Sequence, residues 1–245
     1  MIEVRELSKT YRDRRKALLH AVEGASFRCE PGRVFGLIGP NGAGKTTALR
    51  IISTALRPTS GHAVVAGFDT QREPARVRAS IGFLTANVGL YGRLTPREVL
   101  RFFGELHGMS RPDIASRTSE LSRAFQMDDF LDRACDKLSL GMRQKTNIAR
   151  SLIHSPPVII LDEPTAGLDV LTSRGIVEFI RESRAEGKTV LLSTHIMSEV
   201  ERLCDGLAII HEGRIRFRGT VEELKQRHGA DLEDAFVGAL GDEPC

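Results

Sequence analysis

A glycine-rich turn near the amino terminus has the residue types and spacing of a phosphate-binding loop. Residues 39–46 read GPNGAGKT and fit the pattern GxxxxGK[ST]. Glycines permit a tight turn that aims backbone N–H groups inward, and a following helix adds its positive end. Lys45 and Thr46 suit the phosphates of a nucleoside triphosphate and Mg²⁺. An accidental match is disfavoured, because an apolar strand pattern precedes the loop and a helical pattern follows it.

Two carboxylates end an apolar run later in the chain. Residues 158–163 read VIILDE, which predicts a buried strand over Val158–Asp162. Ligands of open α/β sheets bind outside the carboxyl ends of the strands. Asp162 is therefore placed to hold Mg²⁺, and Glu163 to orient or deprotonate an attacking water. Solvated acids at a strand end are the alternative, which the phosphate loop argues against.

The elements that must position these residues follow from hydrophobic periodicity. Strand–helix alternation predicts a largely parallel sheet covered by helices, with Ile2–Leu7 as an edge strand. A helical stretch interrupts it from about Thr95 to His154. Further predicted strands are Ala25–Cys29, Arg33–Ile38, His62–Val65, Thr189–Ser193 and a hairpin of Ala208–His211 with Arg214–Arg218; predicted helices cover Leu140–His154, Ser173–Glu186, Ile196–Leu203 and the tail.

Composition narrows the class of protein. The 245 residues are 41% hydrophobic and 27% charged, as in a globular domain, with a net charge of only +3. That charge is too mild to indicate a nucleic-acid-binding face. The cysteines form no CxxC pair, and the amino terminus lacks the apolar core of a signal peptide. No apolar run approaches the roughly 18 residues of a membrane helix, so a membrane process would need another chain to cross the bilayer.

Three further segments carry a resemblance to the ABC ATPases. Residues 138–144, LSLGMRQ, resemble the signature LSGGQ of that family. Residues 162–169, DEPTAGLD, resemble its joined Walker B motif and D-loop, and residues 193–195, STH, its switch histidine. Tyr11 stands where these proteins stack an aromatic ring on adenine, although it could equally be a surface aromatic. The ordered motifs span most of the chain, and P-loop kinases and small GTPases lack two of them.

The resemblance implies roles for individual residues. The serine-bearing helix end of one subunit completes the ATP site of a second subunit, although Ser139 could instead serve only as a helix N-cap. His195 contacts the γ-phosphate and the attacking water, and Asp169 orders the opposite site. The expected catalytic residues are Glu163, His195 and Lys45; the expected Mg²⁺ ligands are Thr46, Asp162 and Asn87; the expected nucleotide-binding residues are Gly39, Pro40, Asn41, Gly42, Ala43, Gly44, Lys45, Thr46, Thr47, Tyr11, Ser139, Gly141 and Asp169.

The resemblance also implies a fold and partners. We expect an α/β P-loop NTPase with a mixed, mainly parallel sheet, an amino-terminal antiparallel β part and an inserted α-helical subdomain. Residues 1–245 then form one ABC ATPase domain, with a RecA-like core and antiparallel part over 1–86 and 156–220, a helical subdomain over 87–155 and a helical tail over 221–245. The expected ligands are ATP and Mg²⁺. The expected partners are a second ATPase subunit, in a homodimer or alternatively a heterodimer, and a separate multi-pass membrane permease at the cytoplasmic face of the cell membrane, with no nucleic acid.

One position departs from the family pattern. Most members carry a glutamine after the strand that enters the helical subdomain, and Ala86 stands in its place here. Asn87 keeps an amide one residue later, so either Asn87 substitutes for the glutamine or a water takes over that metal contact. We expect coupling to survive through the loop backbone with slower hydrolysis. Unchanged ATPase and transport in an Ala86→Gln variant would contradict this.

Sequence segments such as GLYGRLTPREVL and LSLGM are most similar to those of the sodium-export and drug-efflux branch of the ABC ATPases. This resemblance predicts an exporter subunit. Two other functions compete. Soluble ABC ATPases of DNA repair carry a long coiled coil, and ribosomal ones carry two ATPase domains, and neither feature is present. A non-hydrolysing regulatory module is disfavoured by Glu163 and His195. The cargo cannot be read from this chain, because the membrane chain selects it.

Overall fold

Three buried strands form the centre of the molecule in the computed structural model, which describes residues 1–12, 18–85 and 89–244. They are β3 (Val34–Ile38), β8 (Thr189–Thr194) and β7 (Val158–Asp162), and every residue in them is buried. Continuous apolar runs of this kind form parallel strands that are covered on both faces. The prediction of a helix-covered, largely parallel sheet is confirmed.

These strands belong to a six-stranded sheet with the order β10-β9-β3-β8-β7-β6. Strand β6 (Ile81–Leu84) pairs in parallel with β7, and β9 (Gly206–His211) pairs in parallel with β3. Strand β10 (Arg214–Gly219) pairs with β9 in an antiparallel hairpin. The predicted hairpin is therefore confirmed. Later strands of the chain lie on both sides of β3, with β8 on one side and β9 on the other. The carboxyl end of β3 is therefore the kind of switch point at which ligands bind in α/β sheets.

A second, antiparallel sheet has the order β2-β1-β4-β5. Its strands are β1 (Ile2–Arg12), β2 (Leu18–Cys29), β4 (Ser60–Val65) and β5 (Phe68–Asp69). The prediction that the first strand lies at an edge is wrong, because β1 pairs with both β2 and β4. Alternation of apolar and polar residues reports a half-buried strand and carries no information on how many neighbours that strand has.

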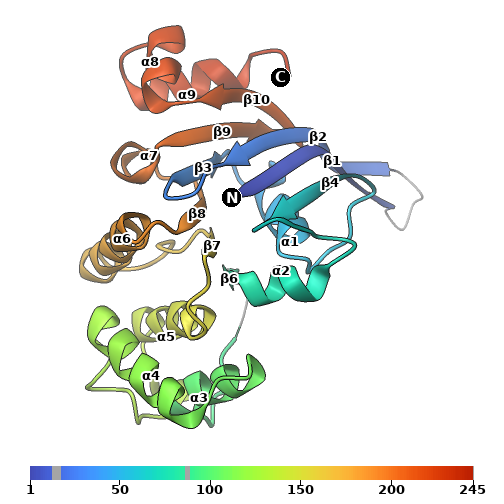
Figure 1. Cartoon of the computed structure of the whole chain (residues 1–245). Helices are drawn as coiled ribbons and strands as arrows, with labels where there is room; N and C mark the ends of the chain where they lie inside the picture. The colour runs from blue at the N-terminus through green and yellow to red at the C-terminus, as the bar shows by residue number, and fades with distance from the viewer. Residues whose placement is uncertain (13–17, 86–88, 245) are drawn as a thin grey trace.

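Alternate residues of the central strands enter different cores. Ile160 packs with α1 (Lys45–Ile52) and the antiparallel sheet, whereas Leu161 packs with α5 (Leu140–Leu152) and α6 (Val170–Ala185). The helices α1 and α5 therefore cover opposite faces of the six-stranded sheet (Figure 1). A third core joins β9 and β10 to α7 (Met197–Leu203), α8 (Val221–His228) and α9 (Leu232–Leu240).

Helices dominate the stretch between β6 and β7. After the short α2 (Pro74–Ser80), which precedes β6, come α3 (Pro96–Leu106), α4 (Arg111–Phe125), a 3₁₀ turn at Cys135–Lys137, and α5. Thr95 and Glu98 close a capping box that fixes the start of α3. These helices lie at the end of the molecule opposite α8 and α9 (Figure 1). We propose that they form the inserted subdomain whose limits the sequence suggests.

Among the described residues, no helix is both long and apolar enough to span a membrane.

Candidate functional site

Three loops leave neighbouring parallel strands at the same edge of the six-stranded sheet. The register pairs Ile38 of β3 with Thr194 of β8, and Ser193 of β8 with Asp162 of β7. The phosphate loop, His195 and Glu163 directly follow these strand ends. The two predicted catalytic loops are thus brought together with the phosphate loop, as expected for carboxyl ends of adjacent parallel strands.

The phosphate loop is wedged between the two sheets. A Cβ on Gly39 would lie 2.2 Å from the carbonyl oxygen of Ile210 in β9, and a Cβ on Gly44 would lie 2.3 Å from that of Ala21 in β2. Gly44 also has φ +112, a conformation open to glycine, and serves as the N-cap of α1. The backbone is therefore held in its turn by contacts that any side chain at these two positions would disrupt.

Lys45 is a buried cation with three acceptors around its ammonium. Its Nζ donates to the carbonyl oxygens of Gly39 at 2.6 Å and Pro40 at 3.2 Å. The same atom lies 3.3 Å from Oε1 of Glu163. Burial of an ammonium is costly unless it is paired, so these contacts hold the charge at the mouth of the loop.

Glu163 sits between the lysine and the histidine. Its Oε1 lies 3.4 Å from Nδ1 of His195, whose side chain is 46% exposed. The backbone of Glu163 has φ +48, which non-glycine residues rarely adopt. The N–H of Glu163 donates to the carbonyl oxygen of Ser193 at 3.0 Å and to its hydroxyl at 3.2 Å. Strand β8 therefore holds the unusual conformation that directs this carboxylate toward Lys45.

Asp162 has one oxygen in use and one free. The hydroxyl of Ser193 donates to Oδ1 at 2.6 Å, while the buried Oδ2 has no hydrogen-bond partner within the described residues. An unsatisfied buried carboxylate oxygen is costly and fits a cation ligand. Thr46, the other predicted ligand with a described position, lies half-buried on the first turn of α1. The predicted ligand Asn87 and the neighbouring Ala86 lie outside the described residues.

The signature segment forms the start of α5. Ser139 is its N-cap, and its hydroxyl accepts from the N–H of Met142 at 3.2 Å. A Cβ on Gly141 would lie 2.9 Å from Oγ1 of Thr172, on the first turn of α6. Helix α5, which carries the signature, packs in a different core from α1, which follows the phosphate loop.

Asp169 acts within its own chain as the N-cap of α6. Its carboxylate accepts from the N–H of Thr172 at 3.0 Å and from the hydroxyl of Thr172 at 2.8 Å. These bonds, first the one from the backbone, lower the pKa of Asp169 below its ordinary value. Thr172, which binds this aspartate, also lies against Gly141, so the D-loop and the start of the signature helix are neighbours on one surface.

Thr47 and Tyr11, which are also predicted to bind nucleotide, lie close to the phosphate loop. Thr47 is half-buried on the first turn of α1. Tyr11 of β1 pairs with Leu19, two residues before Ala21, whose carbonyl oxygen lies against Gly44. Tyr11 is 37% exposed, and the Lys9 ammonium lies 5.3 Å from the centroid of its ring. A stacking surface is therefore available beside the loop.

Comparison with known proteins decides the family. The family model described as "ABC transporter" matches residues 22–166. The ABC transporter ATP-binding protein NatA of Bacillus subtilis is 44% identical over 98% of both chains. The chain belongs to the ABC transporter family. Daunorubicin resistance ATP-binding protein DrrA3 of Streptomyces coeruleorubidus is 37% identical over 98% of this chain and 74% of its own length.

Solved structures agree with this ABC ATPase in fold. A structure titled as the ATP-binding subunit of an ABC transporter has a TM-score of 0.88 at 32% identity, covering 98% of this chain and 99% of that one. A dimeric ATP-binding cassette in a post-hydrolysis state bound to ADP and Pi has a TM-score of 0.81 at 25% identity, covering 90% and 98%. The predicted family and P-loop NTPase fold are confirmed, and this chain is an ATP-hydrolysing subunit of the family.

Sequence reasoning missed two polar side chains that shape the site of this ABC ATPase. Gln144 of α5 donates from Nε2 to the carbonyl oxygen of Pro164 at 2.7 Å, which ties the signature helix to the residue after Glu163. Glu199 of α7 accepts hydrogen bonds from the hydroxyls of Thr165 and Thr194. Pro164 is 20 residues from Gln144 and Thr165 is 34 residues from Glu199, so local sequence patterns do not reveal these contacts. The one sequence signal is the acid Glu199 within the apolar face of α7.

Proposed function

We propose that this chain powers an ABC exporter: two copies close around two Mg-ATP, and their closure moves a separate membrane permease. The observation that carries the proposal is the position of Glu163, whose Oε1 lies 3.3 Å from Lys45 Nζ and 3.4 Å from His195 Nδ1. A carboxylate, a lysine and a histidine converge beside a phosphate loop, as hydrolysis of a terminal phosphate requires.

The roles of these residues follow from their positions. The loop N–H groups, the positive end of α1 and Lys45 bind the β- and γ-phosphates. Glu163 accepts the proton of a water whose oxygen attacks the γ-phosphorus, while the bond from that phosphorus to the β,γ-bridging oxygen breaks and ADP leaves. His195 is exposed enough to reach the γ-phosphate and hold it in line. Catalysis is then mostly positioning and charge stabilisation.

Asp162 and Thr46 would hold the Mg²⁺ that accompanies ATP. The unpartnered Oδ2 of Asp162, within the part of the chain that is described, supports this assignment. The ion supplies neutralisation of phosphate charge. Ser193, through its bond to Oδ1, keeps the aspartate turned so that Oδ2 remains available.

A second copy of the chain completes each site. We assign Ser139 and Gly141, on the surface at the start of α5, to the ATP site of a neighbouring copy, because α5 packs in a different core from the phosphate-loop helix α1. The same surface leaves three large apolar side chains exposed: Leu140 at 55%, Val170 at 70% and Leu171 at 78%. Exposed apolar patches of this kind mark protein interfaces. The dimeric relative supports a symmetric arrangement in which both ATPs lie at the interface.

Mixing two inactive variants tests the composite site. Lys45→Ala removes the phosphate-loop lysine, and Ser139→Arg blocks the signature helix, so each homodimer should lack ATPase activity. In a 1:1 mixture about half of the dimers are heterodimers, each with one intact site, so the rate should recover to about a quarter of wild type. No recovery would contradict the composite site. Lys45→Ala protein that binds and cleaves ATP normally would contradict the whole proposal.

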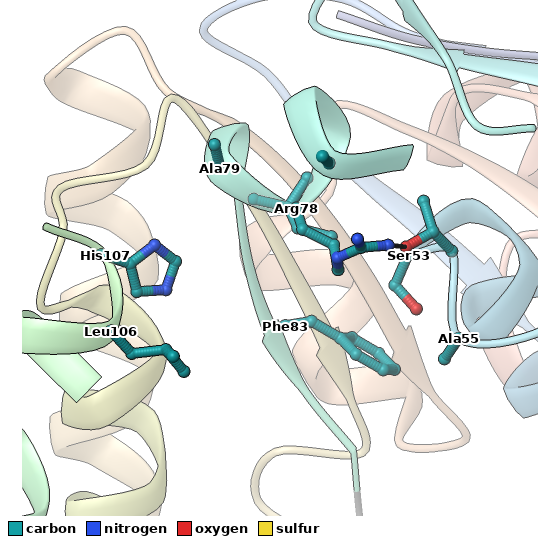
Figure 2. A pocket seen from close by; sticks show the side chains of 10 residues that line it. Ser53, Ala55, Arg78, Ala79, Phe83, Leu106 and His107 are labelled. Atoms are coloured by element: carbon teal, nitrogen blue, oxygen red, sulfur yellow. Dashed lines mark hydrogen bonds between the residues drawn. The ribbon is translucent and has the colours of Figure 1, made fainter. Parts of the chain in front are cut away.

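The permease is proposed to dock in a groove between the helical stretch and the core. A cavity of about 650 Å³ lies there, walled by Leu106 and His107 on one side and by Arg78 and Ser53 on the other (Figure 2). Its lining is largely small or apolar, including Ala55, Ala75, Ala79 and Phe83. Beside it α3 exposes Phe102 at 47% and Leu106 at 69%. An amphipathic helix of a permease fits such a groove.

Docking of this kind would place the chain at the cytoplasmic face of the membrane. The drug-resistance name of a relative supports export as the direction. Co-expression with a candidate permease from a neighbouring reading frame tests the docking site. Ala55→Arg, which fills the groove, should abolish co-purification and leave basal ATPase unchanged, with Val237→Arg on the exposed face of α9 as the control. Full co-purification of Ala55→Arg would contradict this site.

A further inference from the structure

Glu199 of α7 is a buried carboxylate with two hydroxyl donors. It is 8% exposed. The hydroxyl of Thr165 donates to its Oε1 at 2.5 Å, and the hydroxyl of Thr194 donates to its Oε2 at 2.9 Å. Both threonines are buried, at 5% and 2% exposed. One side chain thus spans two segments that are 29 residues apart in sequence, between the positions of Thr165 and Thr194.

The two threonines adjoin the residues proposed to act on the γ-phosphate. Thr165 comes two residues after Glu163, and Thr194 directly precedes His195. The hydroxyl of Thr194 also accepts from the N–H of Ile196 at 3.1 Å, so it closes the turn that carries the histidine. Glu199 therefore links the loop after β7 to the last residue of β8, where the turn to His195 begins.

A carboxylate is an expensive way to hold two loops together. Burying one without a cation is costly, and hydroxyl donors offset only part of that cost. The two carboxylate oxygens of Glu199 accept from the hydroxyls of Thr165 and Thr194. An apolar residue would pack the same space more cheaply. A carboxylate, however, can accept hydrogen bonds from both threonines at once, and it thereby fixes the positions of the two loops relative to each other.

We propose that Glu199 is a positioning residue for hydrolysis: it sets the separation of Glu163 and His195 by holding Thr165 and Thr194. This inference rests on the proposed roles of Glu163 and His195. Because Ser193 already anchors the N–H of Glu163, Glu199 fixes the next residues of both loops and keeps the 3.4 Å approach of Glu163 Oε1 to His195 Nδ1. Within the described part of the chain, Glu199 forms no hydrogen bond or ion pair of its own with the phosphate loop or Lys45, so nucleotide binding should depend on Glu199 much less than hydrolysis does.

The Glu199→Gln variant separates positioning from binding. Glutamine keeps the shape but offers one acceptor oxygen in place of two, so one threonine loses its acceptor. We expect kcat for ATP to fall about tenfold and KM to stay within about twofold of wild type, since misplacing reacting groups slows chemistry without loosening the ligand. The matched control is Glu201→Gln, an exposed acid on the same helix that pairs with Lys225 and should leave both constants unchanged.

Threonine variants keep the test decisive if Glu199→Gln folds poorly. Thr165→Val and Thr194→Val should each lower kcat, whereas Thr165→Ser and Thr194→Ser keep the hydroxyl and should restore it. Combining Glu199→Gln with Thr165→Val should cost no more than the larger single effect. Unchanged kcat in Glu199→Gln, or a risen KM with unchanged kcat, would overturn the inference.

A Glu163→Gln variant, assayed alongside, separates failure of the proposed function from failure of the positioning role of Glu199. If that variant hydrolyses ATP at the wild-type rate, the proposed function itself fails. If it is inactive while Glu199→Gln and both valine variants match wild type, only the positioning role of Glu199 fails.

Discussion

Nζ of Lys45 lies 3.3 Å from Oε1 of Glu163, and this oxygen also faces Nδ1 of His195. The proposed base is therefore an ion-pair partner of the lysine that is proposed to bind phosphate. A phosphate entering the loop would compete with Glu163 for the same ammonium. Removing the negative charge of Glu163 should consequently separate binding from hydrolysis.

We expect Glu163→Gln to bind ATP at least as tightly as wild type, because Lys45 loses a competing anion. Hydrolysis should fall by at least about 100-fold, the usual contribution of a general base. Fluorescent-nucleotide titration and steady-state ATPase assays measure the two effects, and size-exclusion chromatography should show a dimer that persists with ATP. The exposed Glu178→Gln on α6 is the control. Weaker ATP binding in Glu163→Gln would contradict the competition.

Gly39→Ala should damage the phosphate loop. The new methyl group would lie 2.2 Å from the carbonyl oxygen of Ile210, which belongs to a strand with neighbours on both sides. We expect the free energy of unfolding to fall by about 2–3 kcal/mol and ATP affinity to fall at least about tenfold. Gly175→Ala, in open space on α6, should instead stabilise by about 0.5–1 kcal/mol. Urea unfolding measures the stability of both variants, and nucleotide titration measures their ATP affinity. Equal stability of the two variants would contradict the close packing of Gly39 against Ile210.

Gly141→Ala should disturb the signature surface through Thr172. Its Cβ would lie 2.9 Å from Oγ1 of Thr172, the hydroxyl that donates to Asp169. We expect ATP-dependent dimerisation and hydrolysis to fall, with nucleotide binding by the monomer retained. Thr172→Ala removes both close atoms, so the double variant should recover part of the dimerisation measured by light scattering. Failure of Thr172→Ala to restore any dimer would contradict this account.

The strand ends that build the site could be predicted from sequence, because apolar runs and glycine punctuation are local signals. The motif around Lys45 and the acids after β7 needed only the rule that parallel strands end together. Links across elements could not be predicted. The contact of Gln144 with the carbonyl of Pro164 and that of Glu199 with two threonines depend on how helices α5 and α7 dock, which no local pattern specifies.

Strand pairing and short elements were also beyond the sequence. Strand β1 has two partners although its alternation resembles an edge strand, and β2 begins at Leu18, well before the apolar run at its end. Helix α6 begins at Val170, earlier than expected, because Asp169 caps it. Asp169 can be recognised as an N-cap from the sequence only if it is assigned to the start of the helix as well as to the D-loop.

Acid pH should destabilise the protein through a pair of stacked histidines. The rings of His107 and His154 lie 3.6 Å apart at the groove between the helical stretch and the core. Burial, helped by His107 and by Arg117, lowers the pKa of His154 to about 4, against the opposing hydrogen bond to the carbonyl of Ile81. Arg150 also lines the cavity that His154 shares with His107.

As the pH falls from about 6.5 toward 4, the unfolded chain binds a proton that folded His154 does not, so stability declines. Below pH 4 both states are protonated and the loss stops growing. The shift sets a limit of about 3 kcal/mol, which solvent screening should reduce to about 1–2 kcal/mol. Urea unfolding at pH 7.5 and pH 5.0 should therefore show a smaller decline for His154→Gln than for wild type. An identical decline would exclude His154 as the source.

Strand β6, at the end of the sheet, has β7 as its one neighbour, and the chain between these two strands carries α3, α4 and α5. Replacing residues 89–155 with those of a relative would cut the chain at two points, after β6 and before β7. The strand pairing of β3, β7, β8 and β9 would stay intact. Gly82, whose Cβ would lie 2.6 Å from the carbonyl oxygen of Ser151, marks the seam that such a chimera must preserve. The helices can therefore be exchanged as a unit, and such a chimera would transfer the proposed permease-docking surface of α3 together with the signature segment, while the strands that carry Lys45 and Glu163 stay the same.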